Sequence, residues 1–140
     1  MSRLFIDANV LVAVLNKEYP LFSYASRLLS LADKPDMVLY TSPVCLSIAF
    51  YFAEKKSGHK LAREKIRMLV KKIQVCRLDH EMVSKSLQDA RIHDFEDGLE
   101  YYAAVEAGCD FIITENQEDF YFSKIEVCNC KGFLTRYFLL

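Results

Sequence analysis

The sequence predicts an α/β fold in which helices wrap a central parallel sheet of about five strands. Short apolar or β-branched runs alternate along the chain with longer stretches of helical period, and this alternation is typical of such a sheet. The length, 140 residues, fits one domain that would cover residues 1–140. Hydrophobic residues make up 52% of the chain and charged residues 26%, a balance that favours a buried core over disorder.

Five short segments have the composition of strands, because each is a run of β-branched or apolar residues. These expected strands are residues 3–6, 38–40, 73–76, 111–113 and 125–128. The first and the fourth run directly into polar or acidic residues, which makes their carboxyl ends candidate positions for a site.

Helices are expected in the gaps, over residues 9–15, 22–32, 43–55, 60–72, 80–91, 95–107 and 131–138. Ser42 offers a helix cap, and Pro43 suits the first position of the helix that follows it. Gly108 follows a periodic run, as glycine often does after a helix end. The tripeptide Lys56-Ser57-Gly58 interrupts one long helical stretch and therefore predicts a helical hairpin.

The N-terminus and the cysteines indicate the compartment. The chain reaches Asp7 after a short apolar run, so it lacks the apolar stretch of a secretory signal. No run approaches the about 18–20 uncharged residues of a membrane span, and we expect a cytoplasmic protein with no membrane partner. The five cysteines are scattered and mostly lie in apolar runs, which predicts buried free thiols. Cys128-Asn129-Cys130, the one close pair, is a weak zinc signal without a second pair or a nearby histidine.

Basic residues are concentrated in one segment, although the net charge of the chain is −1. Nine of the eighteen lysines and arginines lie between residues 55 and 77, where only Glu64 opposes them. In the helix expected over residues 60–72, four basic residues lie nearly opposite the apolar face, and we call them the basic stripe: Lys60, Arg63, Arg67 and Lys71. The basic stripe is a candidate nucleic-acid-binding surface, and a solvated helix face is an equally good interpretation.

An acid and an amide follow the first expected strand. Phe5-Ile6 runs into Asp7, and Asn9 stands two residues later, where a helix begins. In a parallel α/β sheet, ligands bind beyond the carboxyl ends of the strands, so Asp7 would face a cleft. The alternative is that Asp7 or Asn9 only caps the helix.

A second acidic cluster opens the helix expected over residues 95–107. Asp97 and Glu100 are three positions apart and share a helix face, so they could converge on one cation. Asp94 would be the N-cap of this helix. Acids in a first turn are also favoured by the helix dipole alone, which is a strong alternative.

A third cluster follows the strand expected over residues 111–113. This strand runs into a loop that contains Thr114, Asn116 and Asp119, and an ordinary loop cap is the alternative. Other catalytic patterns are absent from the sequence: the G-x-S-x-G elbow, the P-loop and the G-x-G-x-x-G turn. Their absence argues against α/β hydrolases, P-loop enzymes and dinucleotide binding.

Taken together and in order, these pieces resemble the PIN-domain family. The matching segments are F-I-D-A-N, D-F-E-D-G-L, Y-Y-A-A-V-E-A-G-C-D-F and I-I-T-E-N-Q-E-D-F. They cover most of the chain at intervals similar to those of the family, so the resemblance is specific as a set. The chain most resembles the small prokaryotic branch that includes the toxin ribonucleases of toxin and antitoxin pairs.

The resemblance implies a three-layer α/β/α fold and an acidic pocket that binds Mg²⁺ or Mn²⁺ at the carboxyl edge of the sheet. Matched residue by residue, Asp7 takes the first acid, Asp97 the third, and Thr114, Asn116 and Asp119 the final group. The expected catalytic residues are Asp7, Asp97, Asn116 and Asp119, of which the three aspartates would bind the metal. The expected supporting residues are Asn9, Asp94, Glu100 and Thr114.

One position departs from the family pattern. The family usually places a glutamate early in the helix after the second strand, and this chain has Ile48 there. Glu54 cannot easily replace the glutamate, because six residues further on turn a helix by about 240°. The missing carboxylate weakens the expectation of catalysis more than it weakens the expectation of the fold.

Two functions from different classes stay open. The first is a Mg²⁺- or Mn²⁺-dependent ribonuclease that hydrolyses single-stranded or structured RNA, with a cognate antitoxin as partner and a homodimer as the expected assembly. The second is a PIN-like module whose catalysis is weakened by Ile48 and which binds RNA or protein. A phospho-acceptor or phosphatase domain is disfavoured, because the surroundings of Asp7 lack the additional aspartates that those sites need.

Overall fold

A five-stranded parallel sheet forms the centre of the molecule, as the sequence predicts. The structure, a computed structural model, describes residues 1–139. Its strands are β1 (Ser2–Ile6), β2 (Met37–Thr41), β3 (Gln74–Val75), β4 (Phe111–Ile113) and β5 (Glu126–Cys128). Their order in the sheet is β3-β2-β1-β4-β5, and every neighbouring pair is parallel.

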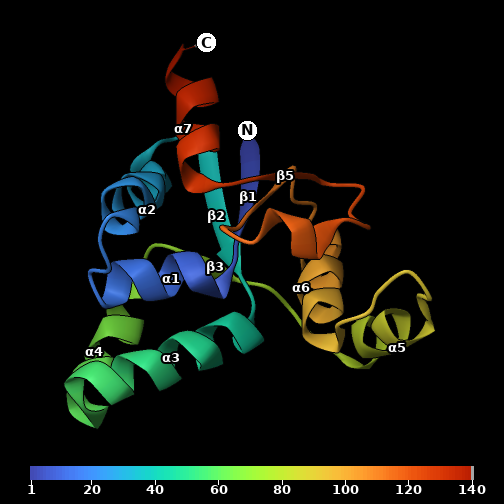
Figure 1. Ribbon diagram of the computed structural model, residues 1–140, viewed down its shortest axis with the longest axis horizontal. Helices are drawn as coiled ribbons and strands as arrows, with labels where there is room; N and C mark the ends of the chain where they lie inside the picture. Colours follow the sequence, from blue (N-terminus) through green and yellow to red (C-terminus); the bar gives the residue numbers. More distant parts are fainter. Residues whose placement is uncertain (140) are drawn as a thin grey trace.

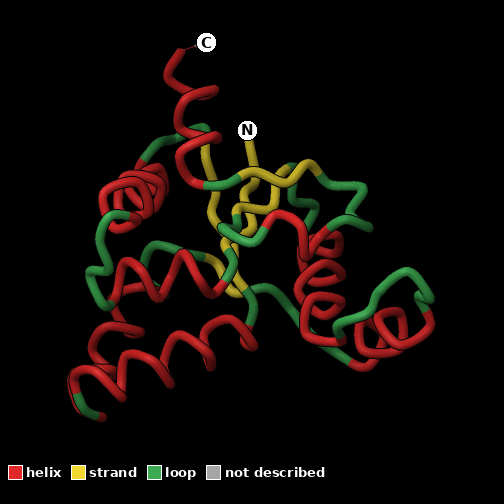
Figure 2. Tube along the Cα trace, in the orientation of Figure 1, coloured by secondary structure: helices red, strands yellow, loops and turns green. Residues whose placement is uncertain are grey.

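Helices cover both faces of this sheet (Figure 1). The α-helices are α1 (Ala8–Leu15), α2 (Leu21–Leu29), α3 (Pro43–Ser57), α4 (His59–Leu69), α5 (His80–Gln88), α6 (Phe95–Glu106) and α7 (Cys130–Leu139), and the 3₁₀ helices are η1 (Ser30–Asp33) and η2 (Gln117–Phe120). Figure 1 shows α1, α2 and α7 on one side of the strands and α5 and α6 on the other, and Figure 2 shows the strands at the centre. This is the expected three-layer α/β/α arrangement. Within residues 1–139, no helix has the length and apolar character needed to span a membrane.

The central strand β1 lies between β2 and β4 and supplies the middle of the core. Leu4, Phe5 and Ile6 are consecutive and each is 0% exposed. An apolar run without alternation is typical of a parallel strand that helices cover on both faces. Asp7 ends this run, so the first polar side chain after the buried strand lies at the carboxyl edge of the sheet.

The helix boundaries predicted from Ser42, Pro43, Gly58 and Gly108 are confirmed. The Ser42 hydroxyl accepts a hydrogen bond from the Cys45 N–H at 3.1 Å, and Pro43 is the first residue of α3. Gly58 turns the chain from α3 into α4 with a φ of 85°, a conformation that glycine adopts without steric cost. Gly108 follows the end of α6, as expected.

Some elements are shorter than the sequence pattern predicted. The helix expected over residues 60–72 ends at Leu69. The N–H groups of Lys71 and Lys72 bond to the carbonyls three residues before them, which makes a tighter turn that leads the chain towards β3. Lys71 therefore lies outside the helix that carries the rest of the basic stripe. The strand expected over residues 73–76 forms sheet pairs only at Gln74–Val75.

Two further helices end earlier than the sequence pattern predicts. The helix expected over residues 22–32 ends at Leu29 and continues as η1. The helix expected over residues 80–91 ends at Gln88. The Asp89 carboxylate accepts from the Arg91 N–H at 3.0 Å, and this local turn competes with further helix.

Gly98 lets α6 lie close against α5 and the segment after it. A Cβ at this position would lie 3.1 Å from Ile92 Cγ2 and 3.1 Å from Ser86 Cβ. These separations leave no room for a branched side chain. Because Gly98 directly follows Asp97, this contact also fixes the turn of α6 that carries Asp97.

Replacing Gly98 with valine should therefore lower the free energy of unfolding by about 1–3 kcal/mol, because the added methyl groups overpack the contact between α5 and α6. Urea unfolding followed by circular dichroism measures this change. Valine at the exposed Ala90 is the matched control and should leave the midpoint nearly unchanged. Equal midpoints for the two variants would contradict the close packing of these helices.

Candidate functional site

Asp7 lies between the end of β1 and the start of α1. It is the N-cap of α1, and its Oδ1 accepts a hydrogen bond from the Ala8 N–H at 2.7 Å. Only 7% of the residue is exposed. The two interpretations of Asp7 from the sequence are compatible, because capping uses Oδ1 and leaves Oδ2 for other partners.

Asp7 Oδ2 faces the end of the neighbouring strand β4. It accepts hydrogen bonds from Thr114 Oγ1 at 2.7 Å and from Asn9 Nδ2 at 3.3 Å. The Asn9 amide also donates to Thr114 Oγ1 at 3.2 Å, and its oxygen accepts from the Glu115 N–H at 3.2 Å. Asn9 and Thr114 thus hold the Asp7 carboxylate in one orientation. The Asn116 N–H donates to the same Thr114 hydroxyl at 3.1 Å, which fixes the start of the following loop.

The N-terminus of α6 brings further carboxylates to this edge of the sheet. Asp94 is the expected N-cap, and its Oδ1 accepts from the N–H groups of Glu96 at 2.9 Å and Asp97 at 3.2 Å. Two donors that would otherwise lack partners at the helix start are thereby satisfied. Asp97 and Glu100, three positions apart, both lie on the side of α6 that faces Asp7.

A cavity of about 440 Å³ lies where these segments meet. Its polar wall consists of Asp7, Asn9, Glu18, Asp94, Glu96, Asp97, Glu100, Asn116 and Asp119, and its apolar wall of Ala8, Val12, Ile48 and Phe52. The four residues expected to be catalytic therefore line a single cavity. We call it the acidic cavity. Thr114 lies buried beside Asp7.

Glu100 is the most deeply buried carboxylate of this wall, with 2% of the residue exposed. Its Oε1 accepts a hydrogen bond from the Cys45 thiol at 2.9 Å. One side-chain oxygen or sulfur atom from each of Asp7, Cys45 and Glu100 lies within 4.8 Å of the others. Burial, followed by the charge of Asp7, raises the pKa of Glu100 to about 10, and burial also raises the pKa of the Cys45 thiol.

The acidic cavity holds unbalanced negative charge. Burial, followed by the charges of Asp94 and Asp119, raises the pKa of Asp97 to about 7, and burial and Asp94 raise the pKa of Glu96. Among the residues described, no lysine or arginine lines the cavity. Carboxylate oxygens gathered from separate segments are the donors that hard divalent cations prefer, and a cation would relieve their mutual repulsion. The residues present fit a divalent metal.

Comparison with known proteins identifies the family. The PIN domain model matches residues 3–118, most of the chain. The chain belongs to the PIN-domain family. It is 28% identical over 143 residues to ribonuclease VapC1 of Aquifex aeolicus strain VF5, in an alignment that covers 97% of this chain and 96% of that protein.

Solved structures confirm the fold of this PIN domain. The structure of VapBC2 from Rickettsia felis, bound to a DNA fragment from their promoter, superposes with a TM-score of 0.70 at 16% identity and covers 91% of this chain and 98% of that chain. Mycobacterium tuberculosis VapC20, described as a toxin that cleaves the sarcin-ricin loop, superposes with a TM-score of 0.62 at 20% identity. That match covers 78% of this chain and 86% of the other.

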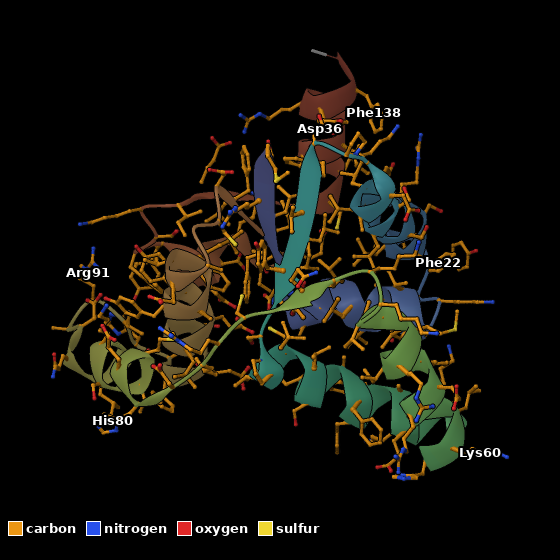
Figure 3. All side chains as sticks on the ribbon, turned by 180° about the vertical axis from the view of Figure 1, so that it is seen from behind. Phe22, Asp36, Lys60, His80, Arg91 and Phe138 are labelled. Atoms are coloured by element: carbon orange, nitrogen blue, oxygen red, sulfur yellow. The ribbon has the colours of Figure 1, made fainter. Side chains whose placement is uncertain are left out.

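The basic stripe of this PIN domain forms a separate surface. Lys60, Arg63 and Arg67 lie on α4, Lys71 follows the end of that helix, and all four are exposed. None of them is among the described residues that line the acidic cavity. Figure 3 shows Lys60 at the tip of the hairpin formed by α3 and α4, on the opposite side of the molecule from α5.

Sequence reasoning missed part of the site, because it assigned no role there to Phe52 or Glu96, which line the cavity, or to Cys45, which donates a hydrogen bond to Glu100. On α3, Cys45, Ile48 and Phe52 share one helix face at the spacing i, i+3, i+7. Cys45 also lies three residues after the Ser42 cap, so the predicted cap already placed it at the carboxyl edge of the sheet. Once Ile48 was assigned to the site, the helical spacing already indicated that Cys45 and Phe52 lie on the same face of α3.

The raised pKa values of Asp97, about 7, and Glu100, about 10, predict how stability depends on pH without metal. The folded protein retains protons that the unfolded chain loses near the ordinary carboxyl pKa values, so this stabilisation is present in acid and is lost as the pH rises through the folded values. The free energy of unfolding from urea titrations in EDTA should therefore fall between about pH 5 and 8.

The Asp97→Asn variant should make that decline about half as steep below about pH 7, because asparagine has no proton to lose and only the contribution of Glu100 remains. Lys124→Ala, a change at an exposed residue outside the acidic cavity, should leave the decline in place. A wild-type stability that rises over the same pH range would contradict the predicted pKa shifts.

Proposed function

We propose that this PIN domain is a Mg²⁺- or Mn²⁺-dependent ribonuclease. The observation that carries the proposal is the convergence of Asp7, Asp97, Asn116 and Asp119 on one cavity. The cavity lies at the carboxyl edge of a parallel sheet, where such folds bind ligands. The relatives support the same activity, because one is named a ribonuclease and another a toxin that cleaves the sarcin-ricin loop.

Asp7, Asp97 and Asp119 would hold the metal. Mg²⁺ usually takes one or two carboxylates together with water and a substrate phosphate, so three acids in one cavity are sufficient. When bound, such an ion supplies a water of lowered pKa as the nucleophile and neutralises charge that grows on the phosphate.

Other residues of the chain would orient the reactants. Thr114 and Asn9 fix Oδ2 of Asp7, so the carboxylate needs no reorganisation when the substrate arrives. Asn116 lines the same cavity and can donate its side-chain amide to a phosphate oxygen. Ile48 and Phe52 supply part of the apolar wall of this cavity.

Replacing Asp7 with asparagine should lower Mn²⁺-dependent cleavage of single-stranded RNA by at least about 100-fold, because a metal ligand is lost. Asparagine is also a good N-cap, so the helix start and the fold should survive. The measurement is a gel assay of a labelled RNA, with circular dichroism as the check on folding. Asp33→Asn is the matched control, since Asp33 is exposed and pairs with Lys72 outside the acidic cavity.

Undiminished cleavage by the folded Asp7→Asn protein would refute the proposal. Equal losses in the Asp7 and Asp33 variants would also count against it, because that result would show that the charge of the protein matters and the site does not.

RNA would approach this cavity with the help of the basic stripe, because clustered carboxylates repel phosphates. Replacing both Lys60 and Arg63 with alanine should weaken RNA binding and reduce the slope of log K against log salt by about 0.7 for each lost phosphate contact. Fluorescence anisotropy with a labelled single strand at several salt concentrations measures both effects. The matched control replaces Lys34 and Lys124, exposed residues outside the stripe. Equal slopes for the two double variants would exclude the stripe from RNA binding.

The proposal extends to partners and location. We expect the 140 residues to act as one domain in the cytoplasm, as a homodimer, and to bind a cognate antitoxin. Support for the antitoxin comes from the Rickettsia felis relative, whose structure was solved as the VapBC2 assembly on promoter DNA. Co-purification with the product of an adjacent small reading frame tests the expected antitoxin, and the mass in solution tests the expected homodimer.

A second candidate function is a PIN module that binds RNA or protein with weakened catalysis. Ile48 favours it, because an isoleucine lines the acidic cavity at a position where the sequence resemblance leads us to expect a carboxylate. Calorimetric titration with Mn²⁺ separates the candidates. Binding that is lost in the Asp7→Asn variant supports the enzyme, and absence of binding by the wild-type protein supports the module.

A further inference from the structure

The carboxylates of the acidic cavity differ in depth. Asp119 is exposed and Asp97 is half-buried, whereas Asp7 and Glu100 are 7% and 2% exposed. The inner end of the cavity is therefore formed by one carboxylate from the end of β1 and one from α6. This pair is not the set that the sequence assigned to the metal, in which Glu100 only supported the site.

The inner pair is packed closely enough to share one cation. Oxygen atoms of Asp7 and Glu100 lie within 4.8 Å of each other and of the Cys45 sulfur. Two buried carboxylates are stable together only when a proton or a cation offsets their charge. The Cys45 thiol donates to Glu100 at 2.9 Å and lies 4.0 Å from Asp7 Oδ1. A thiol donor can orient Glu100 but supplies no full positive charge.

The facing side of α3 contributes no carboxylate. Ile48 lines the cavity, Cys45 lies about one helical turn before it and contacts Glu100, and neither residue is a carboxylate. Glu100 approaches the same space from α6, which contacts α3. Asp97 and Glu100 project from one face of α6, so this helix supplies two carboxylates where α3 supplies none.

From this geometry we infer that Glu100 binds the cation directly and shares it with Asp7. The carboxylate of Glu100 thereby substitutes for the glutamate that is expected on α3, where this chain has Ile48. Cys45 is a positioning residue that holds Glu100 towards Asp7 until the cation arrives. Asp97 and Asp119, nearer the solvent, complete the site on the substrate side. This inference rests on the proposed metal-dependent function and changes which residues form the centre of the site.

Calorimetric titration of the full chain with Mn²⁺ tests the inference without relying on activity. The Glu100→Gln protein should bind Mn²⁺ at least about tenfold more weakly than the wild type, because it lacks a direct ligand. Glu96→Gln removes a charge from the same helix and the same cavity wall at an exposed position, and should change the affinity by less than about threefold. Equal weakening in both variants would show that the loss of negative charge alone explains the weaker binding, and would overturn the inference.

A relocated carboxylate provides the sharper arm of the test. Adding Ile48→Glu to the Glu100→Gln protein places a carboxylate on α3 opposite the lost one, and Mn²⁺ affinity should recover by several-fold. No recovery would contradict the position of the cation between α3 and α6. Should Glu100→Gln fail to fold, Glu100→Asp keeps the charge and withdraws it by one methylene, and wild-type affinity in that variant would overturn the inference.

Different results would contradict the proposed function and the inferred role of Glu100. If the wild-type protein binds no Mn²⁺, the proposed function is wrong. If the wild type binds, Asp7→Asn abolishes binding and Glu100→Gln binds like the wild type, then the function stands and the role of Glu100 is wrong.

Discussion

The hydrogen bond from Thr114 to Asp7 joins the ends of two adjacent parallel strands, and the site depends on it. Ile6 and Ile113 are partners in the register of β1 and β4, so the residue after each of them reaches the carboxyl edge at the same level. The Asp7 N–H continues this register by donating to the Ile113 carbonyl at 3.0 Å. The sheet thus fixes the position of Asp7 before any helix contributes, and a carboxylate held in this way needs little reorganisation to bind a ligand.

Helix α6 adds further carboxylates next to Asp7, and this lowers the stability of the metal-free protein. Burial and mutual repulsion raise the pKa values of Asp97 and Glu100, which means that their ionised forms are unfavourable in the folded protein. An apolar residue in place of Glu100 would avoid that cost, as Ile48 does on α3. The burial of the surrounding core, which includes the consecutive residues Leu4 and Phe5, offsets this unfavourable free energy. Destabilising groups retained in one cavity are typical of functional sites.

The sequence could predict the features that depend on local pattern. Five parallel strands, the Asp94 cap and the Gly58 hairpin follow from composition and capping rules, and the structure confirms them. Helix ends such as Leu69 and Gln88 could not be placed, because turn hydrogen bonds there compete with a helical period that continues in the sequence. The depth of Glu100 was also out of reach, since the spacing places it on the face of Asp97 but burial depends on how α6 meets α3. The partner of Glu100, Cys45, comes from a helix 55 residues away in sequence.

The central claim is that the acidic cavity binds one divalent cation at the carboxyl edge of the sheet. Anomalous diffraction from crystals grown with Mn²⁺ tests it most directly, because the signal locates the metal without reference to activity. The account predicts a single strong peak about 2 Å from carboxylate oxygens of Asp7 and of α6. A cavity without a peak at saturating Mn²⁺, or a peak bound only by exposed acids elsewhere on the protein, would contradict it.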